Sequence, residues 1–432
     1  MNNAGLRAGL AGLLWAGAAS AAVYDVVQQY GAGANDTTND TAAIQAALNA
    51  AASAGGGVVK IPAGVFIAAD LKIGNGVALR GEGRGVSILQ LAAGTAAGKA
   101  ILANADTVNG NSLIGLYDLS FDGNRSNQVN STHCLKMSRV EELTVAGCEF
   151  FDASYYGMFV DAATNLVVQN SYAVSCAQSG FHFLNQRDMR LIGCEAFGNS
   201  GSGFVLNYCE WSTLTVCHAI ENALKGFSFG SVRNTSVSGC RASANGGDGV
   251  STYAPGGACE YMTFNGVSSG ENDGNGFLFG GIRNTTVNHC HSMSNALNGA
   301  SVTTFTGSET TRSITWQGGV IGSNGRHGLL LSGVQQFVLG GAVICDNSGE
   351  SAGTYDGVRI TSGGGVSSER VKIAGCVIRN TGTPLTQNYA VYAAGGSDRI
   401  YVYTTDVTDQ LQSSPINISA APVRETGLNQ GE

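Results

Sequence analysis

The residue types best suited to moving protons fall between positions 136 and 182 of this sequence. Lys136, Tyr156, Asp161 and His182 supply a cation, a phenol, a carboxylate and an imidazole. Tyrosine and histidine often act as general acids and bases, and a nearby cation stabilises developing negative charge. Lys136, Phe159 and His182 are also spaced by 23 residues. A fold that repeats every 23 residues would therefore bring these side chains to one surface.

Glycines recur in the sequence with the same 23-residue period. Gly157, Gly180, Gly203, Gly226 and Gly249 are spaced by 23 residues, and each precedes a short apolar segment such as GMFV, GFHF or GFVL. Short strands with alternating side chains cannot bury a face alone, but stacked copies can. The period therefore predicts an all-β chain, folded as a right-handed single-stranded parallel β-helix.

The alternation of a strand gives each of these side chains a direction. The first and third residues after each repeat glycine should point inward, and the second should point outward. Lys136, Phe159 and His182 then stack in one outward column. Tyr156 stands just before its glycine, and Asp161 lies just beyond its strand. We expect these positions to share one surface of the rod.

The chain divides into four parts around this repeat. Residues 1–22 look like an N-terminal anchor or signal segment, with one positive charge, an apolar stretch and a small-residue ending. Residues 23–56 form a head whose helix starts at Asp40 as N-cap and covers the open end of the stack. Residues 57–400 form the β-helix, and 401–432 a C-terminal cap or tail.

Composition narrows the function classes. The net charge of -8 and the lack of a basic cluster speak against a nucleic-acid partner. No apolar stretch reaches the length of a membrane span. The 11 cysteines lack a CxxC pair, and we expect most of them to be free thiols buried in the stack. No cofactor is expected, although the sequence leaves open the alternative of a structural calcium ion.

The head of the chain resembles a known family. Residues 23–91 contain VYDVVQQYGAGANDTTNDTAAIQAALNAAASAGGGVVKIPAGVF and then VALRGEGRGVSILQL. This opening is similar to that of the pectate-lyase-like β-helix superfamily, which includes secreted polysaccharide lyases, mannuronan epimerases and phage tailspikes. The segment LSFDGNRSNQ and the repeats after it resemble the epimerase catalytic module. The resemblance implies the β-helix fold and a polysaccharide as partner.

The same resemblance suggests roles for the candidate residues. The epimerase family carries Tyr-Gly-Phe-Asp-Pro-His, plus a lysine on an adjacent coil, and removes the proton next to a uronate carboxylate. Tyr156 matches the tyrosine and Lys136 the lysine, whereas Phe159 and Asp161 depart from the motif. If the chain is an enzyme of this type, Lys136 would neutralise the carboxylate, Tyr156 and His182 would share the acid and base roles, and Asp161 would orient one of them.

A second set of residues could bind sugar rings or their charges. The predicted substrate-binding residues are Arg187, Tyr208, Glu210, Trp211 and Tyr253. Arg187, together with two later arginines in the same register, could instead form a repeated salt-bridge column. As an alternative chemistry, Asp161, Asp188 and Glu210 could form the carboxylate pair of a glycoside hydrolase.

Two functions follow from the sequence. The first is a virion spike or fibre of a phage or phage-like particle, which recognises a host surface polysaccharide and could also depolymerise it. Such a spike would be a homotrimer on the virion surface, joined to other virion proteins through its N-terminus. The alternative is a secreted, extracellular bacterial polysaccharide lyase or uronate epimerase.

Overall fold

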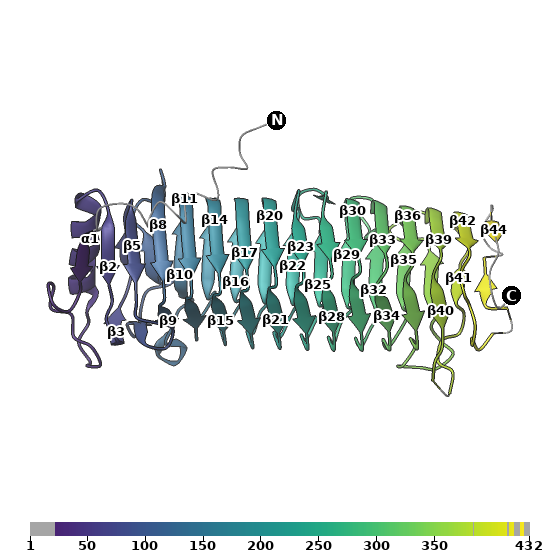
Figure 1. Cartoon of the computed structure of the whole chain (residues 1–432), viewed down its shortest axis with the longest axis horizontal. Coiled ribbons are helices and arrows are strands. Elements are labelled where there is room, and N and C mark those ends of the chain that lie inside the picture. Colours follow the sequence, from purple (N-terminus) through teal and green to yellow (C-terminus); the bar gives the residue numbers. More distant parts are fainter. Residues whose placement is uncertain (1–21, 383, 413, 419–423, 427–432) are drawn as a thin grey trace.

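The chain forms a rod of stacked coils. The computed structural model describes residues 22–382, 384–412, 414–418 and 424–426. Figure 1 shows three long sheets running along the rod, and the chain passes through sheets A, B and C in that order on successive coils. Neighbouring coils pair in parallel, as Met158–Asp161 pairs with Phe181–Leu184. The predicted all-β parallel β-helix is confirmed.

Sheet C carries most of the residues discussed below. Its strands are β4 (Leu71–Ile73), β7 (Ala100–Asn104), β10 (His133–Ser138), β13 (Met158–Asp161), β16 (Phe181–Leu184), β19 (Phe204–Asn207), β22 (Phe227–Gly230), β25 (Val250–Tyr253), β29 (Phe277–Gly280), β32 (Ala300–Thr303), β35 (Leu329–Ser332), β38 (Val358–Thr361), β41 (Val391–Ala393) and β43 (Ile416–Asn417).

Sheet A follows each C strand after a tight turn. Its strands are β1 (Val23–Asp25), β2 (Gly57–Lys60), β5 (Val77–Arg80), β8 (Asn111–Tyr117), β11 (Val140–Ala146), β14 (Thr164–Gln169), β17 (Arg187–Ile192), β20 (Glu210–Thr215), β23 (Ser236–Ser238), β26 (Cys259–Glu260), β27 (Thr263–Asn265), β30 (Ile282–Asn288), β33 (Arg312–Gln317), β36 (Gln335–Gly340), β39 (Glu369–Ala374), β42 (Asp398–Tyr403) and β44 (Arg424–Thr426).

Sheet B completes each coil. Its strands are β3 (Gly64–Ala68), β6 (Ser87–Leu91), β9 (Ser120–Asp122), β12 (Glu149–Phe151), β15 (Tyr172–Val174), β18 (Glu195–Phe197), β21 (His218–Ile220), β24 (Arg241–Ser243), β28 (Ser268–Gly270), β31 (His291–Met293), β34 (Val320–Gly322), β37 (Val343–Cys345) and β40 (Val377–Arg379).

The structure bears on the two predicted terminal segments, residues 1–22 and 401–432. The segment 1–22 lies, except for its last residue, outside the described residues. Strands β43 and β44 join sheets C and A, so coil-forming strands also occur within residues 401–432. The helices in the described part of the chain are too short to cross a bilayer.

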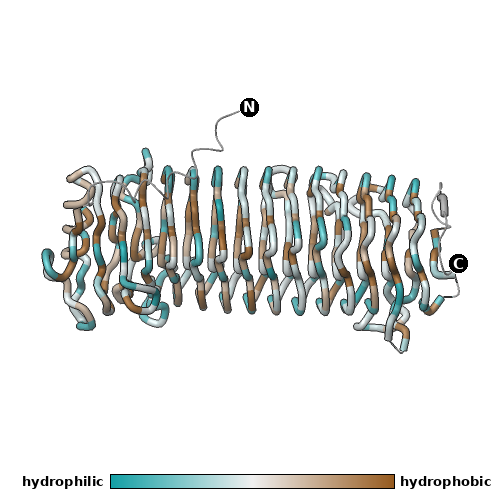
Figure 2. The backbone as a smooth tube through the Cα atoms, in the orientation of Figure 1, coloured by the Kyte–Doolittle hydropathy of each residue, from teal (hydrophilic) through white to brown (hydrophobic). Residues whose placement is uncertain are grey.

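The interior is built from the inward positions that the repeat predicts. Phe181, Phe204 and Phe227 are fully buried, and their rings stack at centroid distances of 4.9 and 5.0 Å. Hydrophobic and hydrophilic residues alternate along the strands of successive coils (Figure 2). The repeat glycine is needed because a Cβ on Gly203 would lie 2.8 Å from the carbonyl oxygen of Gly226.

An asparagine ladder lies inside the turn between sheets B and C, and sequence reasoning missed it. The side-chain amide of Asn222 donates to Asn245 Oδ1 at 3.0 Å, and Asn245 donates to Asn272 Oδ1 at 2.9 Å. The same contact links the buried residues Asn199, Asn222, Asn245, Asn272, Asn295, Asn324 and Asn347. The ladder satisfies buried turn amides and fixes the register of the coils.

The cysteines fill the stack as the sequence predicts. All 11 are free thiols, and all but Cys345 are buried. Cys194, Cys217 and Cys240 lie one coil apart at the turn between sheets A and B, where the Cys217 amide N–H lies 3.4 Å from Cys240 Sγ. Burial raises the pKa of Cys209 to about 12, so this thiol stays protonated and acts as a small apolar side chain.

Helix α1 (Thr41–Ser53) lies at the N-terminal end of the rod (Figure 1). It buries Ile44, Ala47, Leu48 and Ala51 against the first strands, and so covers the open end of the core as predicted. Asp40 precedes the helix, but its carboxylate does not cap it. The carboxylate accepts instead from the amides of Gly33 at 2.7 Å and Ile67 at 3.1 Å, and so ties the preceding loop to strand β3.

Candidate functional site

The outer face of sheet C carries the predicted column. Lys136, Phe159 and His182 pair in register on β10, β13 and β16, so the predicted stacking is confirmed. A second outward column lies one residue before each repeat glycine, or before Cys134, which takes the place of the glycine on β10. It contains His133 and Tyr156, whose ring centroids lie 5.5 Å apart.

The two columns meet in one aromatic cluster, which we call the Tyr156 cluster. It contains His133, Tyr155, Tyr156, Phe159 and His182. The Tyr156 ring centroid lies 4.5 Å from that of His182 and 5.8 Å from that of Phe159. Phe159 in turn lies 5.6 Å from His182. The fold therefore brings the predicted Tyr156 and His182 into direct contact.

Both histidines of the Tyr156 cluster have a pKa of about 4. Burial lowers the pKa of His133, aided by the charges of Lys136 and His182, and burial alone lowers that of His182. The Nδ1 atoms of both rings are buried and have no hydrogen-bond partner within the described structure. At pH 7 both imidazoles are therefore neutral, and each retains a basic ring nitrogen.

The pKa of the tyrosine in the cluster is raised, whereas those of the histidines are lowered. Burial, together with a hydrogen bond to Tyr155, raises the pKa of Tyr156 well above its usual range. Its hydroxyl therefore holds its proton at neutral pH and can act as a proton donor. A neutral imidazole beside a protonated phenol forms a base and an acid in one cluster.

Lys136 lies one coil before Phe159, among other cations. Its Nζ donates to the carbonyl oxygen of Gly98 at 3.0 Å. Lys72 and Lys99, from the two preceding coils, both bind Asp70, with N–O distances of 2.7 and 2.8 Å. Three lysines and one aspartate thus give this end of the C-sheet face a net positive charge.

Asp161 is separated from the aromatic cluster. It ends strand β13, and its Oδ1 accepts a hydrogen bond from Asn185 Nδ2 at 3.0 Å. Within the described residues no hydrogen bond joins Asp161 to Tyr156 or His182. The structure therefore brings Tyr156 and His182 together but leaves Asp161 outside their contact.

The predicted substrate-binding residues are divided between two sheets. Arg187, Glu210 and Trp211 lie on sheet A, where the Arg187 guanidinium stacks 4.5 Å from the Trp211 ring centroid. Tyr208 lies exposed at the preceding turn. Tyr253 lies on sheet C, two coils further on, and donates to Asn207 Oδ1 at 2.5 Å. These residues are carried by sheet A, by sheet C and by the turn between the two sheets.

Charged residues run along sheet A in register. Glu210 lies between Arg187 and Arg233, and Arg233 pairs with Glu260 at 3.5 Å. Arg283 contacts the same glutamate at 3.7 Å. Arg233 and Arg283 thus form a column of salt bridges with Glu260, which was one of the two roles predicted for the arginines in this register.

The carboxylates of the hydrolase alternative lie on two different sheets. Asp188 and Glu210 lie on strands β17 and β20 of sheet A, whereas Asp161 ends a strand of sheet C. Glu210 lies opposite Arg187 in the ladder and Asp188 is exposed. The three side chains share no column.

Sequence reasoning also missed a cluster near the other end of sheet C, formed by His327, Asp356, Arg359 and Tyr392. The sequence contains the pattern that predicts this cluster, because His327 and Asp356 each precede a repeat glycine, as Tyr156 does. Arg359 and Tyr392 lie in the outward column of Phe159. The register rule that selected Tyr156 selects these residues too.

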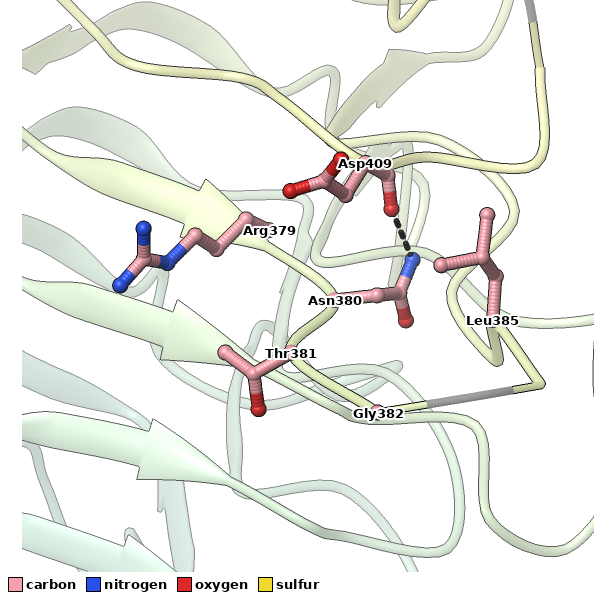
Figure 3. Close-up of a pocket in the computed structure, with 6 residues that line it drawn as sticks. All are labelled: Arg379, Asn380, Thr381, Gly382, Leu385 and Asp409. Atoms are coloured by element: carbon pink, nitrogen blue, oxygen red, sulfur yellow. Dashed lines mark hydrogen bonds between the residues drawn. The ribbon is translucent and has the colours of Figure 1, made fainter.

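A separate hollow lies where sheet B ends near the C-terminus (Figure 3). Its lining residues are Arg379, Asn380, Thr381, Gly382, Leu385 and Asp409. Asn380 spans it by donating to the carbonyl oxygen of Asp409 at 2.6 Å. None of the predicted site residues lines this hollow. In the part of the chain that the structure describes, no group of three His, Cys, Asp or Glu side chains is arranged to hold a metal ion.

Comparison with known proteins identifies the fold. Residues 107–260 match the family model described as a right handed beta helix region. The chain is a right-handed parallel β-helix. This match agrees with the three parallel sheets and with the predicted superfamily.

Sequence relatives cover only part of this β-helix. Mannuronan C5-epimerase AlgE6 of Azotobacter vinelandii is 29% identical over 171 residues, which is 36% of this chain and 20% of that protein. Alginate lyase 7 of the same organism is 30% identical over 173 residues, again 36% of this chain and 20% of that protein. The chain thus spans about a fifth of the length of these relatives.

Solved structures resemble the β-helix over most of its length. The A-module of the AlgE6 epimerase covers 94% of this chain and 99% of its own, with a TM-score of 0.55 and 20% identity. Pre-mature bacteriophage phi29 gene product 12 covers 94% and 55%, with a TM-score of 0.68 and 15% identity. Tailspike protein 3 of bacteriophage CBA120 covers 95% and 61%, with a TM-score of 0.59 and 14% identity. At these identities the similarity shows the fold alone.

Proposed function

We propose that this β-helix binds an acidic polysaccharide on the outer face of sheet C and transfers protons on a uronate unit at the Tyr156 cluster. The contact between the Tyr156 and His182 rings, at 4.5 Å, carries this proposal. Lys136 lies in the same column as His182 and adds the cation that a uronate requires. The names of the epimerase and lyase relatives point to the same substrate class.

The chemistry begins with removal of the proton from the carbon next to the uronate carboxylate. Lys136 pairs with the carboxylate, which accepts the electron pair of the broken C–H bond. His182 is neutral at pH 7 because its pKa is about 4, so its ring nitrogen can take the proton. The negative charge of the bound sugar then stabilises the imidazolium that forms.

Proton donation by Tyr156 can complete either of two reactions, epimerisation or elimination. Its raised pKa keeps the hydroxyl protonated until the intermediate forms. If Tyr156 returns a proton to the opposite face of the same carbon, the sugar is epimerised. If it instead protonates the glycosidic oxygen as that C–O bond breaks, the chain is cleaved and an unsaturated sugar results. The half-buried Phe159 ring beside both residues shields part of the site from water.

A panel of uronate polysaccharides tests this proposal. Unsaturated-sugar absorbance reports elimination, and proton NMR in D₂O reports exchange at the epimerised carbon. Tyr156→Phe should lower turnover about 100-fold or more, the usual contribution of one acid–base group, with little change in polymer binding. Tyr172→Phe, on sheet B, is the matched control. If Tyr156→Phe keeps full activity while Asp188→Asn or Glu210→Gln abolishes it, a hydrolase replaces this proposal.

We also propose that the chain is displayed as a homotrimeric spike on a phage or phage-like particle, attached to other virion proteins through its N-terminal segment. The fold likeness to phi29 gene product 12 and to the CBA120 tailspike supports this setting. Light scattering should return three times the chain mass, and a monomer at micromolar concentration contradicts it. N-terminal sequencing separates the secreted alternative, since a start near Ala22 indicates export and a retained Met1 indicates the spike.

A further inference from the structure

The cluster formed by His327, Asp356, Arg359 and Tyr392, here called the Asp356 cluster, lies on the same face as the Tyr156 cluster. Seven strand-to-strand steps separate His182 from Arg359 along one outward column. At about 4.8 Å per step the two residues lie ~34 Å apart. Of the six residues between them in this column, three are the buried serines Ser228, Ser251 and Ser301, and the other three are apolar.

A buried carboxylate organises the Asp356 cluster. The Asp356 side chain is fully buried, and its Oδ2 accepts from an Arg359 guanidinium N–H at 3.2 Å. Its Oδ1 accepts from the backbone amide of Tyr389 at 3.2 Å. The Asp356 carboxylate therefore links Arg359 on its own coil to the Tyr389 backbone on the next coil, and it fixes the direction of the Arg359 side chain.

Arg359 is held but still reaches the surface. Its guanidinium stacks 4.1 Å from the Tyr392 ring centroid, and about a third of its side chain is exposed. A guanidinium has five N–H donors, and Asp356 takes one of them through Oδ2. The remaining donors suit an oxyanion, because a planar fork matches the geometry of a carboxylate. Tyr389 packs 5.2 Å from Tyr392 and extends the ring surface.

The hydrogen bonds rule out the chemistry proposed for the Tyr156 cluster. The Asp356 amide N–H donates to His327 Nδ1 at 2.9 Å, so the neutral ring carries its proton on Nε2. His327 can therefore donate a hydrogen bond, but its basic nitrogen is already used. Asp356 is shielded from solvent by its own partners. The cluster is built to bind rather than to abstract a proton.

Long loops lie beside both clusters. The turns from sheet B to sheet C are short in the middle of the rod, as between β21 and β22. They lengthen between β9 and β10, next to the Tyr156 cluster, and between β37 and β38 and between β40 and β41, next to the Asp356 cluster (Figure 1). The loop before β38 supplies Tyr355, whose ring lies 5.1 Å from His327.

We infer that the Asp356 cluster is a second subsite for an acidic sugar unit of the same polysaccharide, with Arg359 pairing the carboxylate and Tyr392 and Tyr389 packing on the sugar ring. This inference rests on the proposed function, because it takes its ligand from the same polymer. A polymer held at both clusters would cross the face between them, where small serines and apolar side chains share the outward column. The second contact raises affinity only for chains long enough to reach it.

Calorimetry with oligouronates of increasing length tests the inference. The wild-type chain should gain at least tenfold in affinity once the oligomer spans ~34 Å, since a second linked contact adds avidity. Arg359→Gln and, separately, Tyr392→Thr should remove this gain and leave the binding of short oligomers unchanged. Arg190→Gln, an exposed arginine on sheet A, is the matched control and should keep the gain.

Two results overturn the inference, and they are distinguishable from failure of the proposed function. If folded Arg359→Gln and Tyr392→Thr proteins both keep the length-dependent gain, the Asp356 cluster is not a subsite. The same holds if the wild-type chain binds short and long oligomers equally well. If the wild-type chain binds no uronate of any length, the proposed function and this inference fall together. Circular dichroism confirms that each variant is folded.

Discussion

The Tyr156 and Asp356 clusters lie on one face and use similar residue types, but they differ in what holds their histidines. His182 is surrounded by rings, and its Nδ1 has no hydrogen-bond partner in the described structure. His327 is fixed by an amide N–H, beside a buried aspartate that also holds Arg359. Burial lowers the pKa of both histidines to about 4. The same shift in pKa therefore arises in two different settings.

This difference teaches that burial of a histidine says little about its use. An imidazole packed against rings leaves one ring nitrogen without a hydrogen bond, at the cost of an unsatisfied polar atom. An imidazole with its lone pair already bonded is a fixed donor. Unsatisfied buried groups are uncommon in folded proteins and often mark functional positions. The contrast agrees with the two proposals, proton transfer at one cluster and binding at the other.

The largest expected effect separates the two clusters by turnover. His182→Gln removes the base and should lower turnover on a uronate polymer about 100-fold or more. His327→Gln keeps a donor at a binding site, so turnover at saturating polymer should change less than about threefold. Steady-state kinetics on the same polymer, with kcat and KM determined separately, check both values. Equal losses of kcat in the two variants would remove the distinction.

The second prediction concerns acid stability. His133 and His182 have folded-state pKa values of about 4, below the ordinary value near 6.5. Between these values the unfolded chain binds protons that the folded chain does not, so the free energy of unfolding falls as pH falls from about 6.5 to 4. The double variant His133→Gln, His182→Gln should reduce this loss by on the order of 3 kcal/mol. Denaturant midpoints at pH 7 and pH 4 measure it.

The Asp356 cluster should respond less to acid, and this provides the control. Burial raises the pKa of Asp356, so protonation relieves an unfavourable buried charge as pH falls. This slope opposes that of His327, whose pKa is lowered. Replacing both residues, as His327→Gln with Asp356→Asn, should therefore change the acid sensitivity less than the first double variant does. An equal or larger change would show that the two sites are electrostatically alike.

The third prediction compares the two aspartates at neutral pH. Asp356→Ala leaves Arg359 and the Tyr389 amide without their partner and should lower the free energy of unfolding by about 2 kcal/mol, less than a fully buried pair would because Arg359 is partly exposed. Asp161→Ala loses a hydrogen bond to an exposed asparagine and should cost less than about 1 kcal/mol. Urea unfolding at pH 7 measures both, and a reversed order contradicts the structural role of Asp356.

The sequence predicts the columns of this fold better than their contacts. The glycine period and the alternation of strands place Lys136, Phe159 and His182 in one column because a parallel β-helix repeats its register on every coil. Asp161 shows the limit, since its position next to the site was predictable but its hydrogen bond to Asn185 depends on turn geometry. Asp40 shows the same limit, because its carboxylate bonds two loop amides instead of the helix start.

The missed features were missed for different reasons. The asparagine ladder keeps the same period as the glycines, four residues before Gly203, Gly226 and Gly249, so periodicity alone could have found it. The Asp356 cluster obeys the register rule too. Longer loops interrupt the 23-residue period before β38 and β41, however. Asp356 keeps the glycine signal because Gly357 follows it, but Tyr389 precedes Ala390 and lacks that signal.

The smallest expected effect distinguishes the two cations by their salt dependence. Lys136 is a point charge on a flexible stem, whereas the Arg359 guanidinium is stacked on a ring and paired with a buried carboxylate. Lys136→Gln should weaken polymer binding about fivefold at low ionic strength, and this difference should vanish near 0.5 M salt because exposed charges are screened within ~4–5 Å there. The effect of Arg359→Gln should persist at the same salt, since stacking and a bidentate contact are screened less. Lys372→Gln, an exposed lysine on sheet A, is the control and should bind like wild type at every salt concentration. Binding titrations at three salt concentrations measure all four proteins. If the losses in the lysine and arginine variants fade together, Arg359 acts only through its charge, and the two ends of the face recognise the polymer in the same way.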